Sequence, residues 1–317
     1  MFCPKRAALR HVSFAARLSD AIHTIMPLTI GRFAPSPTGP LHAGSLLAAV
    51  ASYCEARAAG GRWLVRMEDL DPPREMPGAA DLILRQLEAC GLEWDGEVLY
   101  QSRRHAAYEA ALDQLHQQGH VFWCRCSRTD LARQPQSTYP GTCRAFTSPR
   151  TDAAIRLRVP PGLVSFTDSV FGRQQEEVAH TVGDFILKRR DGHYAYQLAV
   201  VVDDAEQGIT DIVRGADLLD NTARQILLQR CLDLPSPRYT HLPLVVHGDG
   251  TKLSKQTHAP ALPLSGTASL LVQALLMLGQ DIPADMATEP PATILRWAVA
   301  HWQLARVPRH PVILPAN

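Results

Sequence analysis

Residues 31–45 decide the fold of this chain, and they read Gly31-Arg32-Phe33-Ala34-Pro35-Ser36-Pro37-Thr38-Gly39-Pro40-Leu41-His42-Ala43-Gly44-Ser45. The prolines and the Thr-Gly pair predict a stiff loop, and the turn that follows predicts the start of an amphipathic helix. A helix N-terminus that offers backbone N–H groups, a glycine for close approach and a histidine is suited to bind an anion. An ordinary strand–loop–helix connection has the same pattern, so the rest of the chain must decide.

The composition is that of a globular protein with a sizeable core. The chain has 317 residues, of which 46% are apolar and 20% charged, as in one large domain or a few modules. Its 32 Lys and Arg nearly balance its 31 Asp and Glu, so any surface that binds nucleic acid has to be local. No apolar run approaches the roughly 18 residues of a membrane span, and we expect no membrane association.

The cysteines and the N-terminal residues bear on where the protein works. Seven cysteines, an odd number, are spread along the chain. This favours a reducing compartment over a disulfide framework, and we expect a cytoplasmic protein. Residues 1–26 form a basic extension, which is either a transit peptide or an over-extended start of the chain. We favour the over-extended start, because Met26 leads straight into the deciding stretch.

The deciding stretch belongs to a βαβ unit. Residues 28–30 predict a short buried strand before the loop, and the helix after the loop should end near residues 60–61. Residues 62–67 predict a second strand with Glu68 at its carboxyl end. Such a unit implies an α/β fold with a parallel sheet, whose ligands bind beyond the carboxyl ends of the strands. The loop and Glu68 should therefore face one crevice.

Later segments extend this α/β pattern. After the second strand, residues 77–90 predict one helix and Ser102 is the predicted N-cap of another. Alternation of apolar and polar side chains over residues 151–190 predicts an antiparallel β-rich insertion. A buried strand over residues 209–215 should carry Arg214 as an exposed cation at its carboxyl end.

The remaining segments lie beyond that strand. Residues 217–231 predict a helix, and residues 241–246 predict a last strand. This strand runs into a glycine-flanked loop that contains Lys252 and Lys255. Two such lysines suit a mobile phosphate clamp, although basic loops are common. Residues 270–304 predict a small helical cap.

A group of cysteines lies between residues 121 and 146. Cys124-Arg125-Cys126 is followed by Cys143 after a short loop, and three thiols so close together suggest a structural zinc site. The alternative is three buried, inert cysteines. The residue types leave the fourth ligand open between His120 and Tyr139, whose phenol would have to ionise.

Four segments together resemble the class I aminoacyl-tRNA synthetases, and within them the glutamyl branch. Residues 35–45 resemble that branch's version of the HIGH signature, and Lys252-Leu253-Ser254-Lys255-Gln256 resembles its KMSKS loop. Residues 66–71 and 213–222 resemble two further segments, in the expected order. The resemblance implies a Rossmann-like catalytic domain.

Two kinds of departure refine this resemblance. Ser45 stands where the signature has its second His, and Gln256 where the loop has its last Ser, both of which vary within the glutamyl branch. Glutamyl-tRNA synthetases also carry a large helical anticodon-binding region after this loop, where only a short helical piece follows here. Together with the cysteine and tyrosine cluster, this is similar to the glutamyl-Q tRNA(Asp) synthetases. That family attaches glutamate to the queuosine base of tRNA(Asp).

The resemblance assigns roles to residues. The residues implied in catalysis are His42, Lys252 and Lys255. Those implied in binding glutamate are Arg32, Phe33, Ala34, Pro35, Ser36, Glu68, Tyr196 and Arg214. Those implied in binding ATP, with Mg²⁺, are Gly39, His42, Gly44, Ser45 and Lys255. The zinc ligands implied are Cys124, Cys126, Tyr139 and Cys143.

These roles fit the chemistry of glutamate activation. Glutamate has two carboxylates and an ammonium, so its site needs fixed cations and an anion. By the resemblance Arg32 and Arg214 are the cations and Glu68 is the anion. The expected partners are ATP, L-glutamate and tRNA(Asp) that carries queuosine, and the expected state is a monomer. Two alternatives remain: a short glutamyl-tRNA synthetase that charges tRNA(Glu), and a catalytically silent tRNA-binding paralogue.

The expected organisation is a catalytic domain with an insertion. After the extension over residues 1–26, the halves of the catalytic domain should span residues 27–120 and 186–240. Residues 121–185 should form the inserted zinc subdomain between them. Residues 241–317 should hold the KMSKS-like loop and a helical region.

Overall fold

A seven-stranded sheet forms the centre of the computed structural model, with the strand order β3-β2-β1-β9-β10-β6-β7. The structure describes the whole chain except residues 1–27, 134–137, 247, 249–250, 252–259 and 314–317. All neighbours in this sheet pair in parallel except β6 and β7, which form an antiparallel hairpin. This confirms the predicted α/β fold with a parallel sheet. The strands are β1 (Ile30–Phe33), β2 (Arg62–Met67), β3 (Leu99–Tyr100), β6 (Val164–Asp168), β7 (Gly172–Glu176), β9 (Asp211–Gly215) and β10 (Arg238–Leu242).

The helix that follows the deciding loop packs on the centre of the sheet. It is α1 (Ala43–Ala58), which connects β1 to the parallel strand β2 and contacts β1, β2 and β9. One of its buried positions, Ser52, accepts a hydrogen bond from the indole nitrogen of the fully buried Trp63 on β2 at 2.9 Å. The loop before α1 is thereby fixed above the carboxyl ends of the central strands.

Further helices complete the main layer. The described α-helices around the sheet are α2 (Ala79–Ala89), α3 (His105–Gln117), α6 (Tyr196–Glu206) and α7 (Thr222–Cys231). Of these, α7 contacts β6, while α6 lies between α3 and α7. Short 3-10 turns occupy Pro72–Arg74, Gln101–Arg103, Ala216–Asn221, Ala284–Thr288 and Leu304–Arg306.

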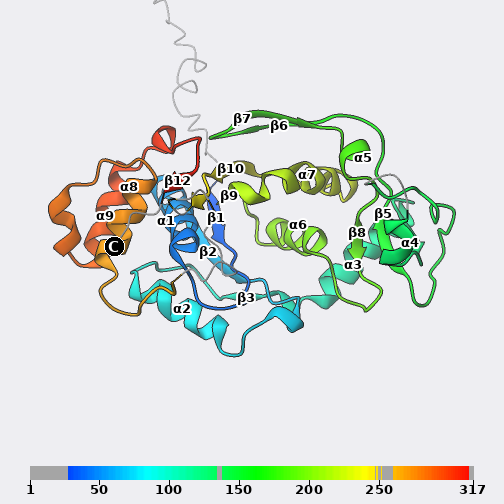
Figure 1. The fold of residues 1–317 in the computed structure, drawn as a ribbon, viewed down its shortest axis with the longest axis horizontal. Helices are drawn as coiled ribbons and strands as arrows, with labels where there is room; N and C mark the ends of the chain where they lie inside the picture. Colours follow the sequence, from blue (N-terminus) through cyan, green and yellow to red (C-terminus); the bar gives the residue numbers. More distant parts are fainter. Residues whose placement is uncertain (1–27, 134–137, 247, 249–250, 252–259, 314–317) are drawn as a thin grey trace, which may run out of the picture.

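A small antiparallel sheet lies at one end of the molecule (Figure 1). Its order is β4-β5-β8, and the short helices α4 (Arg128–Ala132) and α5 (Val178–Thr181) accompany it. Its strands are β4 (Val121–Cys124), β5 (Ala154–Leu157) and β8 (Ile186–Lys188). The expectation of a single antiparallel insertion over residues 151–190 is therefore only partly right. The hairpin β6–β7 joins the main sheet instead, because β6 pairs in parallel with β10.

The C-terminal part forms the opposite end of the molecule (Figure 1). Helices α8 (Ala268–Met277) and α9 (Pro291–His301) both pack against α1, and β11 (Val245–Val246) pairs with β12 (Val312–Ile313). The two helices agree with the predicted helical cap. They belong to the same hydrophobic cluster as α1 and β2, so the cap shares the core of the sheet.

Several predicted boundaries shift. The first strand begins at Ile30, not at residue 28, because Leu28 is half exposed. Ser102 does not cap α3: it lies in a 3-10 turn, where its backbone N–H and hydroxyl donate to the carboxylate of Asp69. The predicted helix over residues 217–231 begins as a 3-10 turn and becomes α-helical at Thr222.

In the part of the chain that the structure describes, no helix combines the length and the apolar character needed to cross a bilayer.

The packing of α8 on α1 predicts a contrast between two neighbouring leucines. Leu275 is fully buried, whereas Leu276 is 55% exposed. We expect Leu275→Ala to lower the free energy of unfolding by about 2–5 kcal/mol, because it leaves a cavity in the core. Leu276→Ala is the matched control and should change it by less than about 0.5 kcal/mol. Urea unfolding of both variants measures the difference, and equal effects would contradict this packing.

Candidate active site

A cavity of about 580 Å³ opens where the carboxyl ends of β1, β2, β9 and β10 meet. Parallel sheets bind ligands at this edge, as the βαβ unit predicted. The lining residues that the sequence singled out are Arg32, Phe33, Ala34, Pro35, Ser36, His42, Gly44, Ser45, Glu68, Tyr196 and Arg214. The structure thus brings together most of the predicted site. Gly39 is not among the lining residues, and Lys252 and Lys255 lie outside the described residues.

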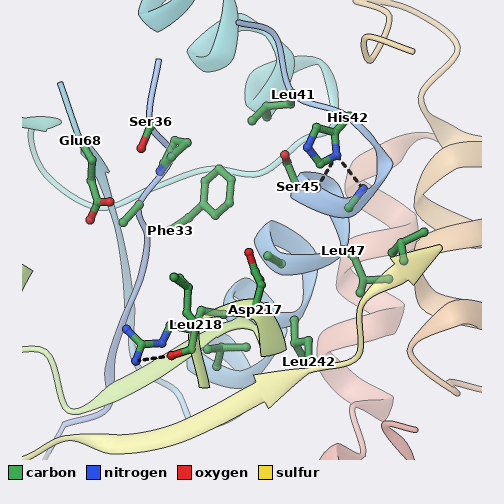
Figure 2. A pocket seen from close by; sticks show the side chains of 18 of the residues that line it. Phe33, Ser36, Leu41, His42, Ser45, Leu47, Glu68, Asp217, Leu218 and Leu242 are labelled. Atoms are coloured by element: carbon green, nitrogen blue, oxygen red, sulfur yellow. Dashed lines mark hydrogen bonds between the residues drawn. The ribbon is translucent and has the colours of Figure 1, made fainter. Parts of the chain in front are cut away.

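The cavity has two chemically different ends (Figure 2). Glu68 and Ser36 lie toward one end, and His42 and Ser45 lie toward the other. Phe33 stands between them, and Asp217 and Leu218, from the turn after β9, form another wall. An elongated ligand with different chemical groups at its two ends would fit such a cavity.

His42 is the N-cap of α1. Its Nδ1 accepts hydrogen bonds from the backbone N–H groups of Gly44 and Ser45, at 3.1 and 3.3 Å. The neutral ring therefore carries its proton on Nε2. In the structure these two N–H groups donate to the His42 ring, and the binding of ATP at this turn stays a prediction. Gly44 has a steric role as well, because a Cβ there would lie 3.1 Å from the His42 ring.

Arg32 is held by a buried carboxylate that the sequence analysis did not single out. Its Nε donates to Oδ1 of Asp204 at 3.1 Å, and Nη2 of Arg66 donates to the same oxygen at 2.7 Å. Burial alone would raise the pKa of Asp204, but the two guanidinium groups outweigh it and hold that pKa below its ordinary value. Asp204 therefore stays ionised and fixes both arginines.

Glu68 lies beside this ion cluster, but its pKa is raised, whereas that of Asp204 is lowered. Burial raises the pKa of Glu68 to about 7, against the lowering effect of Arg66 and Arg32. Its Oε1 lies 3.7 Å from Nη2 of Arg66. A carboxyl with this pKa is about half protonated near neutral pH. A cation that entered the cavity would favour the ionised form.

Arg214 is buried, with 5% of its surface exposed, so the prediction of an exposed cation is wrong. The side chain turns inward because three groups accept hydrogen bonds from it: Nε2 of His241, Oγ1 of Thr222 and the carbonyl of Leu218. Its Nη1 is buried without a hydrogen-bond partner in the described part of the chain. A buried nitrogen of this kind suits an anionic ligand.

Tyr196 begins α6 and brings a hydroxyl to the lining of the cavity. Burial is the main reason that the pKa of Tyr196 is raised, so the phenol stays protonated and can donate a hydrogen bond. A protonated phenol is compatible with the neutral hydrogen-bonding role predicted for Tyr196.

Four buried residues that support this cavity were not predicted from the sequence: Arg66, Asp168, Asp204 and His241. Arg66 lies on β2 and Asp204 on α6, and both are almost fully buried. Charged residues are rarely buried unless they are paired. Arg66 and the adjacent carboxylates Asp203 and Asp204 in apolar segments were the available signal.

The three cysteines come together in the small sheet. The Sγ atoms of Cys124, Cys126 and Cys143 lie within 4.8 Å of one another, and the Sγ atoms of Cys126 and Cys143 are 3.6 Å apart. Two thiolates on a tetrahedral zinc ion, each at about 2.3 Å, would be about 3.8 Å apart. The cluster therefore has the donor set and the spacing that fit a metal ion.

Tyr139 is part of the same cluster. Its hydroxyl lies 3.4 Å from Sγ of Cys124 and 3.8 Å from Sγ of Cys126, and it accepts from the backbone N–H of Cys143 at 2.8 Å. Burial raises the pKa of Tyr139. His120, the other ligand that the residue types left open, is not in the group that the structure brings together among its described residues.

The family described as tRNA synthetases class I (E and Q), catalytic domain, matches residues 29–262. A protein from Thiobacillus denitrificans named glutamyl-Q tRNA(Asp) synthetase is 58% identical over 290 residues, which cover 90% of this chain and 96% of the relative. A protein of the same name from Neisseria meningitidis serogroup B is 54% identical over 297 residues, covering 90% and 99%.

Solved structures show the same fold. Glutamate-tRNA synthetase from Elizabethkingia anophelis superposes with a TM-score of 0.77 at 24% identity, over 91% of this chain and 68% of the other. A glutamate tRNA ligase from Elizabethkingia meningosepticum, in complex with its amino acid, has the same TM-score and identity. The chain therefore belongs to the class I tRNA synthetases of the E and Q type and, within them, to the family of glutamyl-Q tRNA(Asp) synthetases.

Proposed function

We propose that this protein activates L-glutamate with ATP and transfers it to the queuosine base in the anticodon of tRNA(Asp). The observation that carries the proposal is one cavity that holds two buried arginines, Arg32 and Arg214, and the carboxyl of Glu68. Two cations and one anion complement the two carboxylates and the ammonium of glutamate. The names of the relatives and membership of the family support the same substrate and acceptor.

The amino acid occupies the end of the cavity that contains Glu68 and Ser36. Arg32 and Arg214 bind the carboxylates, and ionised Glu68 binds the ammonium. Ser36 and Tyr196 supply neutral hydrogen bonds beside Phe33, Ala34 and Pro35. A neutral side-chain amide would leave a buried guanidinium unpaired, so the site rejects glutamine.

ATP occupies the end that contains His42. There Nε2–H of His42 binds the phosphates, while Gly44 and Ser45 hold its ring in place; Gly39 keeps the loop close to the nucleotide. Lys255, together with Lys252, meets the charge that develops on the β- and γ-phosphates. Mg²⁺ accompanies the triphosphate and neutralises part of its charge when bound.

The reaction has two steps that share this site. In the first, a carboxylate oxygen of glutamate attacks the α-phosphorus of ATP, and the bond to the leaving pyrophosphate breaks. The product is glutamyl adenylate. In the second, a hydroxyl of the queuosine cyclopentene ring attacks the activated carbonyl carbon, loses its proton and releases AMP. Catalysis by positioning and charge stabilisation is sufficient for the first step.

We also propose that the cysteine cluster holds one structural Zn²⁺ per chain, with Cys124, Cys126, Tyr139 and Cys143 as its ligands. The spacing of the thiols and the phenol supports this set. When bound, zinc ties the segment after β4 to the loop that contains Cys143. We further propose a cytoplasmic monomer with catalytic halves over residues 27–120 and 186–240, the insertion over 121–185, and the loop and helical region over 241–317. Within the span of the insertion, the hairpin β6–β7 contributes to the main sheet.

The acceptor RNA is the decisive test of the function. Labelled glutamate should be transferred to tRNA(Asp) that carries queuosine and not to the same tRNA without it. Glutamate-dependent pyrophosphate exchange should occur without any tRNA. Labelling of tRNA(Glu) alone, or equal labelling of both forms of tRNA(Asp), would refute the proposed acceptor. No exchange at all would favour a silent paralogue.

The raised pKa of Glu68 predicts that glutamate binds more weakly at low pH. The ammonium needs the ionised carboxylate, which is lost as the pH falls through about 7. We expect the affinity for glutamate to fall about fivefold to tenfold from pH 7.5 to pH 6. Isothermal titration calorimetry at several pH values measures it. Glu68→Gln should bind weakly with a flat pH profile; an unchanged slope in this variant would assign the titration to another group.

The zinc proposal is tested by metal analysis. The purified protein should contain about one zinc per chain, and Cys143→Ser should lose it because a ligand thiolate is removed. Cys231→Ser is the control: Cys231 is also buried but is not in the cluster, so its zinc content should be unchanged. If the wild-type protein contained no zinc, the zinc proposal would be wrong, and the cluster would consist of three inert thiols.

A further inference from the structure

The guanidinium of Arg214 is held by a hydrogen bond to a residue of the neighbouring strand β10. Arg214 on β9 lies in register with His241 on β10, and Nε of Arg214 donates to Nε2 of His241 at 3.0 Å. Nη2 donates to Oγ1 of Thr222 at 2.9 Å. These bonds fix two of the three guanidinium nitrogens.

The His241 ring is held in turn by Asp168, at the end of β6. Nδ1 of His241 lies 2.7 Å from Oδ2 of Asp168, and the backbone N–H of His241 donates to the same oxygen at 3.0 Å. The other oxygen, Oδ1, accepts from the backbone N–H groups of Val170 and Phe171 at 3.0 and 2.8 Å. The carboxylate is thereby fixed on both oxygens.

This arrangement selects one tautomer of His241. A carboxylate only accepts hydrogen bonds, so Nδ1 of His241 carries the proton, and Nε2 is then an acceptor that suits the N–H of Arg214. Burial lowers the pKa of His241, which keeps the ring neutral. A proton on Nε2 would instead prevent this nitrogen from accepting the hydrogen bond that Nε of Arg214 donates.

In the described part of the chain, Arg214 forms no ion pair with a carboxylate. Its hydrogen-bond partners among the described residues are a neutral ring, a hydroxyl and a carbonyl, and its Nη1 is buried without a partner. Arg32, by contrast, donates directly to the carboxylate of Asp204. A carboxylate ligand would therefore complete Arg214, because a buried cation is costly until it is paired.

We propose that Asp168 and His241 are positioning residues that aim Nη1 of Arg214 at a carboxylate of glutamate and so determine the affinity of the site for this substrate. The inference rests on the proposed function, because it names glutamate as the ligand. Neither residue lines the cavity. They therefore affect the binding of glutamate and not the binding of ATP.

Steady-state pyrophosphate exchange separates the two substrates. His241→Leu removes the hydrogen bonds of the ring to Arg214, Asp168 and Thr222. It should raise the KM for glutamate about 10- to 100-fold while the KM for ATP stays within about twofold. His241→Gln keeps one acceptor and one donor and should restore part of the affinity. Asp168→Asn leaves the ring but removes its carboxylate, and it should raise the KM for glutamate about threefold to tenfold.

A matched control lies on the same strand. The guanidinium carbon of Arg214 lies 5.4 Å from the centre of the Tyr239 ring, whose hydroxyl accepts from Gln229 at 2.9 Å. Tyr239→Phe keeps the ring and removes only the hydroxyl, so it should leave both KM values within about twofold. Thermal unfolding of each variant shows which of them fold. Should His241→Leu fail to fold, Asp168→Asn decides by the same criterion.

Two results would overturn the inference. One is a folded His241→Leu or Asp168→Asn variant with the wild-type KM for glutamate. The other is a parallel rise of both KM values, which indicates a general structural role. Failure of the proposed function is distinguishable, because wild-type protein would then show no exchange that depends on glutamate.

Discussion

The carboxylate of Asp204 is the interaction on which the substrate cavity depends. One of its oxygens accepts from both Arg32 and Arg66, which lie on the neighbouring parallel strands β1 and β2. Removing these charges from water is costly, and only direct pairing offsets the cost. Because Asp204 stays ionised, it fixes the arginines before any ligand arrives, and the cavity is organised in advance. The electrostatic environment of Glu68 follows from the same cluster, since Arg66 and Arg32 lower its pKa while burial raises it.

Topology explains how residues far apart in sequence reach this cavity. The order β2-β1-β9-β10 places four parallel carboxyl ends side by side. The loop after β1 and Glu68 after β2 thus meet Arg214 of β9 and the segment after β10. The unexpected neighbour is β6, which joins the main sheet next to β10 and carries Asp168. Strand β6, which the sequence predicts as part of the insertion, is therefore a strand of the main sheet and holds the His241 ring through Asp168.

Periodicity and motifs predicted the parts of this structure that local sequence controls. The βαβ unit and the grouping of the three cysteines needed only spacing and residue type. What they could not predict was pairing across long separations: the alternation in β6 fits either sheet, and only its partner β10 decides. The exposure of Arg214 was misjudged for the same reason. A cation at a strand end is normally solvated, and it is buried here because His241 and Thr222, distant in sequence, accept its hydrogen bonds.

The two arginines of the cavity differ in how they are held, and this difference has a chemical consequence. Arg32 is already paired with a carboxylate, so a ligand adds little net neutralisation there, and its contribution is mainly directional. Arg214 is backed by neutral groups, so the charge of the ligand itself completes it. Under the proposed function, discrimination between a carboxylate and an isosteric amide is therefore strongest at Arg214, where an amide would leave the buried cation uncompensated. Selectivity for an acidic substrate thus depends on keeping the carboxylates of the protein from pairing with Arg214. The neutral ring of His241 does this for Asp168, because it lies between Asp168 and Arg214.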